Sequence, residues 1–288
     1  MEKYMSKTVL VTGAAGYIGR HVVKALLDLG AKVVAVDIRT ENIDPRADRK
    51  NIDIFSGDPD LYNELGEPDA CLHLAWQDGF AHNADSHIML LPAHFTFLKN
   101  LLNAGLKQLA VMGSMHEVGY YEGEIREDTP TNPRSMYGIA KNALRDIMTL
   151  ETAKHGAALQ WIRGFYIYGD DRSNHSVFTK IIEAESKKQK TFPFNSGINQ
   201  YDFIPVEELA RQLALTVMQT EVTGIINCCS GKPVALKDKV EEFLRKNQYE
   251  ITLDYGKFPD RAYDSPAIWG STDKIDTIVR NYESSRKG

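Results

Sequence analysis

Two side chains in the middle of the sequence have the types and spacing needed for proton transfer. Tyr137 and Lys141 stand four residues apart in Tyr-Gly-Ile-Ala-Lys, which places both on one face of a helix. A lysine ammonium beside a phenol lowers the pKa of the phenol, which then exchanges a proton with a substrate hydroxyl or carbonyl. Such a pair also occurs by chance on a solvated helix face, so this interpretation needs further support.

Ser114 supplies that support, because it closes an apolar β-type run at Leu109–Met112. The carboxyl edge of a parallel sheet is where ligands bind in α/β folds, so the hydroxyl is expected to bond the same substrate oxygen as Tyr137. His116 follows two residues later. It has the chemistry of an acid or base near neutral pH, although orienting the loop is an equally open role.

A glycine-rich segment near the N-terminus indicates a dinucleotide site. It is spaced G-x-x-G-x-x-G between the β-type run Thr8–Thr12 and a helical pattern over Tyr17–Leu29. Glycines allow a tight turn and a close approach to a pyrophosphate, whose charge then faces the helix N-terminus. Lys141 would then hold the nicotinamide ribose. The residues expected to contact the cofactor here are Gly13, Ala15, Gly16, Tyr17, Ile18 and Gly19.

Asp37 is expected to select the form of the cofactor. It lies 18 residues after Gly19, at the end of a second strand over Lys32–Val36. A carboxylate there accepts the ribose hydroxyls and repels a 2′-phosphate, which favours NAD over NADP. Arg39 keeps NADP open, because a nearby arginine accommodates that phosphate. Asp58 follows the third expected strand and is predicted either to reach the adenine amino group or to form a turn.

Strand-like and helical stretches alternate through the first two-thirds of the chain, which predicts a doubly wound parallel α/β sheet of Rossmann type. A NAD-binding domain is expected over residues 1–169, and residues 170–288 are expected to form mainly a small α/β C-terminal substrate lobe, interleaved with it. Further strands are predicted at Ile52–Phe55, Ala70–Ala75, Leu109–Met112 and Leu159–Arg163. Helices are predicted at Pro92–Ala104, Tyr137–Lys154, Val177–Lys188, Val206–Thr220 and Leu236–Asn247.

The composition is that of an ordinary globular protein. The 288 residues are 43% hydrophobic and carry a net charge of −5, which gives no basic footprint for nucleic acid. No stretch approaches the ~18 apolar residues of a membrane span, and no signal peptide is evident, so a cytoplasmic protein is expected. Cys71, Cys228 and Cys229 are predicted to be reduced core thiols. No metal site is predicted.

Taken together, these motifs resemble the extended short-chain dehydrogenase/reductase family. The glycine loop, Asp37, His73-Leu74-Ala75, Ser114 and the Tyr137/Lys141 pair carry the likeness, which is closest to the nucleotide-sugar epimerases, dehydratases and ketoreductases. The resemblance implies reversible hydride transfer at a sugar carbon. It also implies that Leu74 and Ala75 border the cofactor, and that a homodimer forms through a four-helix interface including Tyr137–Lys154.

Departures from the family pattern narrow the choice among the reactions that the family catalyses. The 4,6-dehydratases of the family follow the residue matching Ser114 with an Asp-Glu pair, where this chain has Met115 and His116, so dehydration is disfavoured. Tyr201 replaces an arginine that usually grips the substrate diphosphate, and Arg261 resembles a second such arginine. The resemblance places the substrate against Ser114, Met115, His116, Asn174, His175, Tyr201 and Arg261.

The overall likeness is greatest to reductases of dTDP-4-dehydro-6-deoxyglucose. The leading hypothesis is therefore an NAD(P)-dependent oxidoreductase, with NAD the favoured cofactor, that reduces the 4-keto group of a nucleotide-activated 4-keto-6-deoxysugar. A nucleotide-sugar 4-epimerase is the second hypothesis. A uronate or aldose dehydrogenase and a non-catalytic dinucleotide sensor remain as further alternatives.

Overall fold

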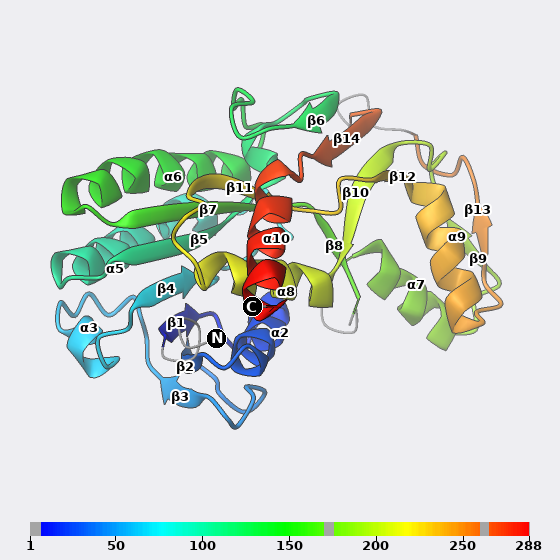
Figure 1. Cartoon of the computed structure of the whole chain (residues 1–288). Coiled ribbons are helices and arrows are strands. Elements are labelled where there is room, and N and C mark those ends of the chain that lie inside the picture. The colour runs from blue at the N-terminus through cyan, green and yellow to red at the C-terminus, as the bar shows by residue number, and fades with distance from the viewer. Residues whose placement is uncertain (1–6, 170–175, 260–264, 288) are drawn as a thin grey trace.

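A parallel sheet with helices on both faces forms the larger part of the molecule (Figure 1). The structure, a computed structural model, describes residues 7–169, 176–259 and 265–287. Within these residues the sheet has seven strands in the order β11-β7-β5-β4-β1-β2-β3. The strands are β1 (Thr8–Thr12), β2 (Lys32–Asp37), β3 (Asp48–Asn51), β4 (Ala70–His73), β5 (Gln108–Ser114), β7 (Ala158–Gly164) and β11 (Gly224–Cys228).

The strand order creates a switch point between β1 and β4. From β1 the chain moves outward to β2 and β3, then returns to β4 on the other side and continues to β5, β7 and β11. All of these neighbours pair in parallel. Ligands of such sheets bind outside the carboxyl ends of the strands at this switch point. The predicted doubly wound Rossmann fold is confirmed.

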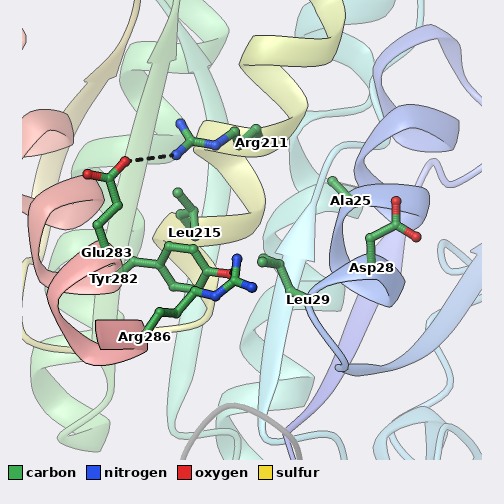
Figure 2. Close-up of a pocket in the computed structure, with 8 residues that line it drawn as sticks. All are labelled: Ala25, Asp28, Leu29, Arg211, Leu215, Tyr282, Glu283 and Arg286. Atoms are coloured by element: carbon green, nitrogen blue, oxygen red, sulfur yellow. Dashed lines mark hydrogen bonds and ion pairs between the residues drawn. The ribbon is translucent and has the colours of Figure 1, made fainter. Parts of the chain in front are cut away.

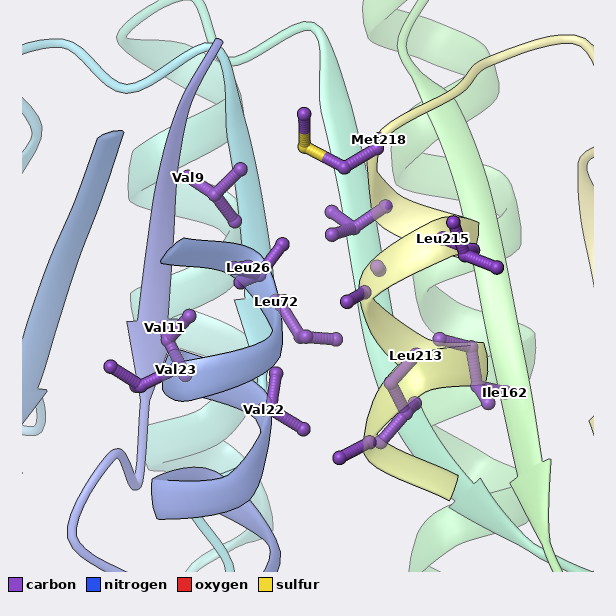
Figure 3. Packing of buried hydrophobic residues seen from close by; sticks show 14 of the residues in the cluster. Val9, Val11, Val22, Val23, Leu26, Leu72, Ile162, Leu213, Leu215 and Met218 are labelled. Atoms are coloured by element: carbon purple, nitrogen blue, oxygen red, sulfur yellow. The ribbon is translucent and has the colours of Figure 1, made fainter. Parts of the chain in front are cut away.

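Two hydrophobic clusters fix the helices to the two faces of the sheet, because side chains alternate along each strand. Val9 and Val11 of β1 face one cluster, and Leu10 faces the other. The first cluster packs α2 (Tyr17–Asp28), α8 (Val206–Val217) and α10 (Asp273–Lys287) on the sheet, and Figure 3 shows its side chains between α2 and α8. The second packs α3 (Leu61–Glu64), α5 (Leu91–Asn103) and α6 (Met136–His155), with α4 (Ser86–Met89) against α5 and α6.

A smaller α/β lobe lies beside the main sheet (Figure 1, right). A third hydrophobic cluster forms its core. Its main sheet has the order β12-β10-β14-β6, with β8 also paired to β10, and β9 pairs with β13. Its elements are β6 (Gly123–Ile125), β8 (Tyr166–Tyr168), α7 (Val177–Ser186), β9 (Thr191–Pro193), β10 (Gln200–Pro205), β12 (Pro233–Ala235), α9 (Leu236–Asn247), β13 (Thr252–Asp254) and β14 (Ala267–Gly270).

The chain crosses between the two parts more than once. β6 comes from the first half of the sequence but pairs in the smaller lobe, whereas α8, β11 and α10 come from the second half and pack on the main sheet. No helix among the described residues is long and apolar enough to cross a membrane. The three cysteines are free and buried, as predicted.

One predicted strand is wrong. Residues 52–55 are not a strand, and the third strand of the sheet is instead Asp48–Asn51, a polar and largely exposed run. Ile54 is buried in the cluster beneath the sheet, and Ile52 and Phe55 pack against that cluster. The apolar residues thus cover the core from a loop, while a solvated edge strand needs no apolar pattern of its own.

A surface hollow of about 550 Å³ lies among α2, α8 and α10 (Figure 2). Its lining includes Ala25 and Leu29 at the C-terminal end of α2, and Tyr282 of α10. The C-terminal end of α2 leads into the start of β2, so the hollow lies at the amino edge of the sheet. The chemistry predicted from the sequence belongs to the carboxyl edge, on the opposite side.

Candidate active site

The glycine loop has no room for side chains. A Cβ on Gly13 would stand 2.7 Å from the backbone nitrogen of Ala75, and one on Gly19 would stand 2.1 Å from the carbonyl oxygen of Gly13. Gly13 also has a φ of +67°, which side-chain-bearing residues rarely adopt. The loop thus packs directly on the turn after β4, and it presents backbone N–H groups at the start of α2.

Asp37 lies beside this loop, as predicted. It ends β2, and its Oδ2 accepts a hydrogen bond from the backbone nitrogen of Ala15 at 3.0 Å. Leu74 and Ala75 follow β4 and bond to Thr12 of β1, which places both against the loop. Tyr17 donates its hydroxyl to the carbonyl oxygen of Gly169 at 2.5 Å. The residues expected at the dinucleotide are therefore gathered at the switch point.

Asp58 lies on the surface. Its Oδ1 accepts a hydrogen bond from the backbone nitrogen of Asp60 at 2.8 Å, and the residue is exposed. This is the turn that the sequence offered as the alternative interpretation. Contact with an adenine group stays a prediction.

Helix α6 carries Tyr137 and Lys141 one turn apart. The helix begins after Ser135, whose side chain accepts a hydrogen bond from the backbone nitrogen of Gly138, and it ends at Gly156 in the left-handed conformation. A Cβ on Gly138 would lie 2.4 Å from the carbonyl oxygen of His116. The glycine between the two functional residues thus lets α6 approach the turn after β5.

Ser114, Tyr137 and Lys141 meet at the carboxyl end of β5, as the sequence predicts. The expected lowering of the Tyr137 pKa by Lys141 is wrong: burial raises the pKa of Tyr137 to about 12, and the hydrogen bond from Ser114 offsets this only in part. Lys141 is 2% exposed, and its Nζ donates to the carbonyl oxygen of Met112 at 2.6 Å. Burial lowers the pKa of Lys141 to about 7. The phenol is protonated at neutral pH, which suits it to give a proton to a substrate carbonyl oxygen.

A buried carboxylate fixes Ser114 relative to α6. Glu117 is fully buried, and its Oε1 accepts hydrogen bonds at 2.8 Å from the backbone nitrogen of Ser114 and from Trp161 Nε1. Its other oxygen pairs with Arg163 at 3.3 Å and with Arg145 of α6 at 3.4 Å. Two guanidinium groups thus lie against this buried carboxyl group and compensate its charge.

Four rings surround Tyr137, and we call Trp76, His82, His87 and His116 the ring cage. His82 stacks on Tyr137 with centroids 5.4 Å apart, and His87 lies 5.2 Å from it. Trp76 and His116 meet its edge at 6.1 Å. Burial lowers the pKa of His116 to about 3 and also lowers the pKa of His82, so both are neutral near pH 7.

Sequence reasoning found only one member of the ring cage. His116 was predicted because it follows Ser114, whereas Trp76, His82 and His87 come from the segment between β4 and α5, which has no periodic pattern. Trp76 directly follows Ala75, and this position at a strand end was the one available signal.

Of the remaining predicted substrate contacts, the structure describes Met115 and Tyr201, which lie in the core of the smaller lobe. Met115 is 5% exposed and Tyr201 is 8% exposed, and both pack in the hydrophobic cluster of the smaller lobe. Tyr201 lies against Tyr166 with centroids 4.4 Å apart. Asn174, His175 and Arg261 lie outside the described residues. Substrate contact by these five residues stays a prediction. The described residues hold no cluster suited to a metal ion.

Comparison with known proteins agrees with this geometry. The model of the family described as "NAD dependent epimerase/dehydratase family" matches residues 9–229. The chain belongs to that family. It is an NAD-dependent enzyme of the short-chain dehydrogenase/reductase type, and the tight glycine loop beside Asp37 fits that cofactor.

Two curated relatives differ in their distance from this chain. The dTDP-6-deoxy-L-talose 4-dehydrogenase (NAD(+)) of Aggregatibacter actinomycetemcomitans is 43% identical over 91% of this chain and 99% of its own length. A UDP-glucose 4-epimerase of Azospirillum brasilense is 25% identical over 94% of this chain and 85% of its own length.

Solved structures share the fold. A UDP-N-acetylglucosamine 4-epimerase from Methanobrevibacter ruminantium M1 superposes with a TM-score of 0.82 at 22% identity, covering 95% of this chain and 92% of that one. A Thermus thermophilus UDP-glucose 4-epimerase in complex with NAD gives 0.79 at 20% identity, with 94% and 92% covered.

Proposed function

We propose that the protein is an oxidoreductase that interconverts the 4-keto and 4-hydroxyl groups of a nucleotide-activated 6-deoxysugar. NAD would accept the hydride in the oxidising direction, and NADH would donate it in the reducing direction. Support comes from the meeting of Ser114, Tyr137 and the buried Lys141 at the carboxyl end of β5. The 43% identity to a 4-dehydrogenase of a dTDP-6-deoxysugar supplies the substrate class and the position of reaction.

The geometry gives each catalytic side chain a role. In the reducing direction Tyr137 donates its proton to the 4-keto oxygen, and Ser114 donates a hydrogen bond to the same oxygen. Lys141 in its protonated form places a positive charge beside the phenol, and its amine is available to the nicotinamide ribose. His82 and His116 of the ring cage are neutral near pH 7 and border the site without adding a competing charge. Oxidation runs through the same groups in reverse.

The test is the loss of NADH absorbance when purified protein meets a dTDP-4-keto-6-deoxysugar. We expect one NADH to be consumed for each sugar reduced, and formation of NADH when a 4-hydroxy-6-deoxysugar nucleotide and NAD are supplied. The matched control is Tyr137→Phe, which keeps the ring and lacks the proton. Absence of NADH turnover with every such sugar nucleotide would contradict the proposal.

A nucleotide-sugar 4-epimerase is the second candidate, because several fold neighbours and several of the more distant curated relatives are named 4-epimerases. An epimerase returns the hydride to the substrate it came from, so it keeps its NAD through the cycle. A reductase must exchange NADH for NAD each turn. Protein purified without bound NAD favours the proposed function, and stoichiometric NAD that survives gel filtration favours the epimerase.

The proposal includes a homodimer that works in the cytoplasm in deoxysugar biosynthesis. On α6, Ile139 and Leu150 are 46% and 73% exposed, and their separation of three helical turns places them on one face. Met89 of α4, which packs against α6, is 76% exposed. Burial of this apolar face against a second copy would remove it from water. Replacing Leu150 with glutamate should yield a monomer in light scattering.

A further inference from the structure

Trp76 lies outside the motifs that the sequence predicted. It nevertheless contacts the catalytic groups of the site. The Nζ of Lys141 lies 3.6 Å from the centroid of the indole, within the range of a cation–π interaction. The indole Nε1 donates a hydrogen bond to Nδ1 of His87 at 3.0 Å. The ring also stacks on His94 of α5, with centroids 4.4 Å apart and an interplanar angle of 18°.

A chain of side-chain contacts that begins with the stacking on His94 connects the indole to β1. Nδ1 of His94 lies 2.9 Å from Nε2 of His73, and the other nitrogen of His73 lies 2.8 Å from the hydroxyl of Thr12. Both histidines are 1% exposed. Thr12 is the last residue before the glycine loop. The position of Trp76 is therefore set by the strand that leads into the cofactor site.

The hydrogen bond from Trp76 to His87 joins the two residues that flank the loop 77–86. His87 also contacts the carbonyl oxygen of Ala81 through Nε2 at 3.0 Å, so its ring joins both sides of the loop. From this loop the carbonyl oxygen of His82 accepts the backbone N–H of Tyr137 at 2.9 Å. The side chain of Asn83 accepts the N–H of Met136 at 3.3 Å. The loop therefore caps the first turn of α6, where Tyr137 stands.

We propose that Trp76 is a positioning residue for both catalytic groups on α6. Its ring face holds the ammonium of Lys141 in the direction of the cofactor, and its N–H, through His87, holds the loop that caps Tyr137. The inference rests on the proposed function for its catalytic meaning. Its contacts make separate predictions about cofactor binding and about the order of the first turn of α6.

The ring face matters because Lys141 has few other partners. Its ammonium is buried, with the carbonyl oxygen of Met112 as its hydrogen-bond acceptor. Glu117 favours its charge from a distance, and His73 and His94 on the neighbouring elements are neutral because burial lowers the pKa of each. Removal of the indole leaves a buried ammonium with less compensation, which favours either the neutral amine or a different rotamer.

The two functions of Trp76 are separated by three variants. Trp76→Phe keeps an aromatic face and loses the N–H, His87→Leu loses the acceptor of that N–H, and Trp76→Leu loses both the face and the N–H. Trp269→Phe, in β14 of the smaller lobe, is the matched control for a tryptophan replacement. NADH affinity is measured directly by fluorescence titration without any sugar, and amide hydrogen exchange is followed over residues 136–141. Thermal unfolding identifies any variant that fails to fold.

We expect Trp76→Leu to weaken NADH binding by about tenfold or more, and Trp76→Phe to keep the affinity within about threefold of the wild type. Trp76→Phe and His87→Leu should each speed amide exchange at Met136 and Tyr137 and lower kcat by a similar factor. The double variant should lose no more than His87→Leu alone, because both changes break the hydrogen bond from Trp76 to His87, and only His87→Leu also removes the contact with Ala81.

Wild-type NADH affinity in folded Trp76→Leu would overturn the role of the ring face. Unchanged exchange at Tyr137, or effects of Trp76→Phe and His87→Leu that multiply in the double variant, would overturn the role of the N–H. These results are independent of the sugar. If the wild type reduces no sugar nucleotide, the proposed function fails while the binding and exchange measurements still decide the role of Trp76.

Discussion

The glycine loop and the ring cage lie at the same edge of the sheet, but they are built in different ways. The glycine loop is one continuous segment whose geometry depends on missing side chains, since a Cβ on Gly13 or Gly19 would meet backbone atoms. The ring cage depends on large side chains from two separate segments, at 76–87 and at His116, which meet only around Tyr137 of α6.

The glycine loop is therefore a general feature of the fold, whereas the ring cage is particular to this site. Any dinucleotide enzyme of this fold needs a close backbone approach to a pyrophosphate, so the loop carries little information about the sugar. The cage borders Tyr137, the proposed proton donor, so we expect its rings to determine what lies beside the reacting carbon. A substitution in one of these regions should therefore leave the other intact.

Tyr137→Phe should have the largest effect. The variant keeps the ring and its stacking on His82 but removes the proton, so we expect kcat to fall by about 10³-fold. NADH affinity should remain near that of the wild type, since the glycine loop is untouched. Steady-state kinetics with a 4-keto sugar nucleotide and a parallel NADH titration check this. Retained activity would mean that the site binds the dinucleotide without using Tyr137 as its acid.

Gly19→Ala disturbs the other region. The new Cβ would stand 2.1 Å from the carbonyl oxygen of Gly13, so α2 must move away from the loop. Overpacking of this kind costs about 1–3 kcal/mol, which corresponds to about a fivefold to 150-fold loss of NADH affinity if the strain falls on the bound loop. Gly79→Ala is the control, because a Cβ there meets nothing within 4 Å. Equal NADH titrations for the two variants would count against this account of the loop.

Asp37→Asn should shift the choice between cofactors by about tenfold toward NADPH. The amide oxygen still accepts the N–H of Ala15, while the charge that repels a 2′-phosphate is gone. Arg39 then becomes a partner for that phosphate, so the further change Arg39→Ala should reverse the gain. The ratio of kcat/KM with NADH and NADPH measures this. An unchanged ratio in Asp37→Asn would show that another residue selects the cofactor.

His116→Gln should have the smallest effect. Burial lowers the pKa of His116 to about 3, so its protonated form is lost as the pH rises through 3 and the ring is neutral from pH 5 upward. We expect kcat to change by less than about tenfold, with the same pH profile between about pH 5 and pH 9. A limb near pH 6.5 that is present in the wild type and absent from the variant would show instead that His116 exchanges a proton.

Local patterns account for what the sequence predicted well. The alternation of β-type and helical stretches, the glycine spacing and the four-residue interval from Tyr137 to Lys141 are each contained in a short segment, and the structure has them as expected. The prediction of the third strand was wrong because the apolar pattern at 52–55 indicates burial rather than strand pairing. An exposed edge strand such as Asp48–Asn51 has no pattern to detect.

Long-range contacts account for what the sequence missed. The pairing of Glu117 with Arg163 joins residues far apart in the chain, and the contact of Lys141 with Trp76 joins α6 to the turn after β4. No spacing rule links such residues, because the fold alone brings them together. A family motif can also point to a residue whose surroundings the sequence does not show. Tyr201 was identified from such a motif, and the structure buries it among aromatic side chains in the smaller lobe.

The most direct test of the central claim follows the hydride itself. NADH that carries deuterium at the transferred position of its nicotinamide ring is incubated with the protein and a dTDP-4-keto-6-deoxysugar, and the product is examined by NMR. The account predicts one deuterium at C4 of the sugar and one NAD formed for each product molecule. A sugar whose C4 configuration is changed with no deuterium incorporated and no NADH consumed would contradict it.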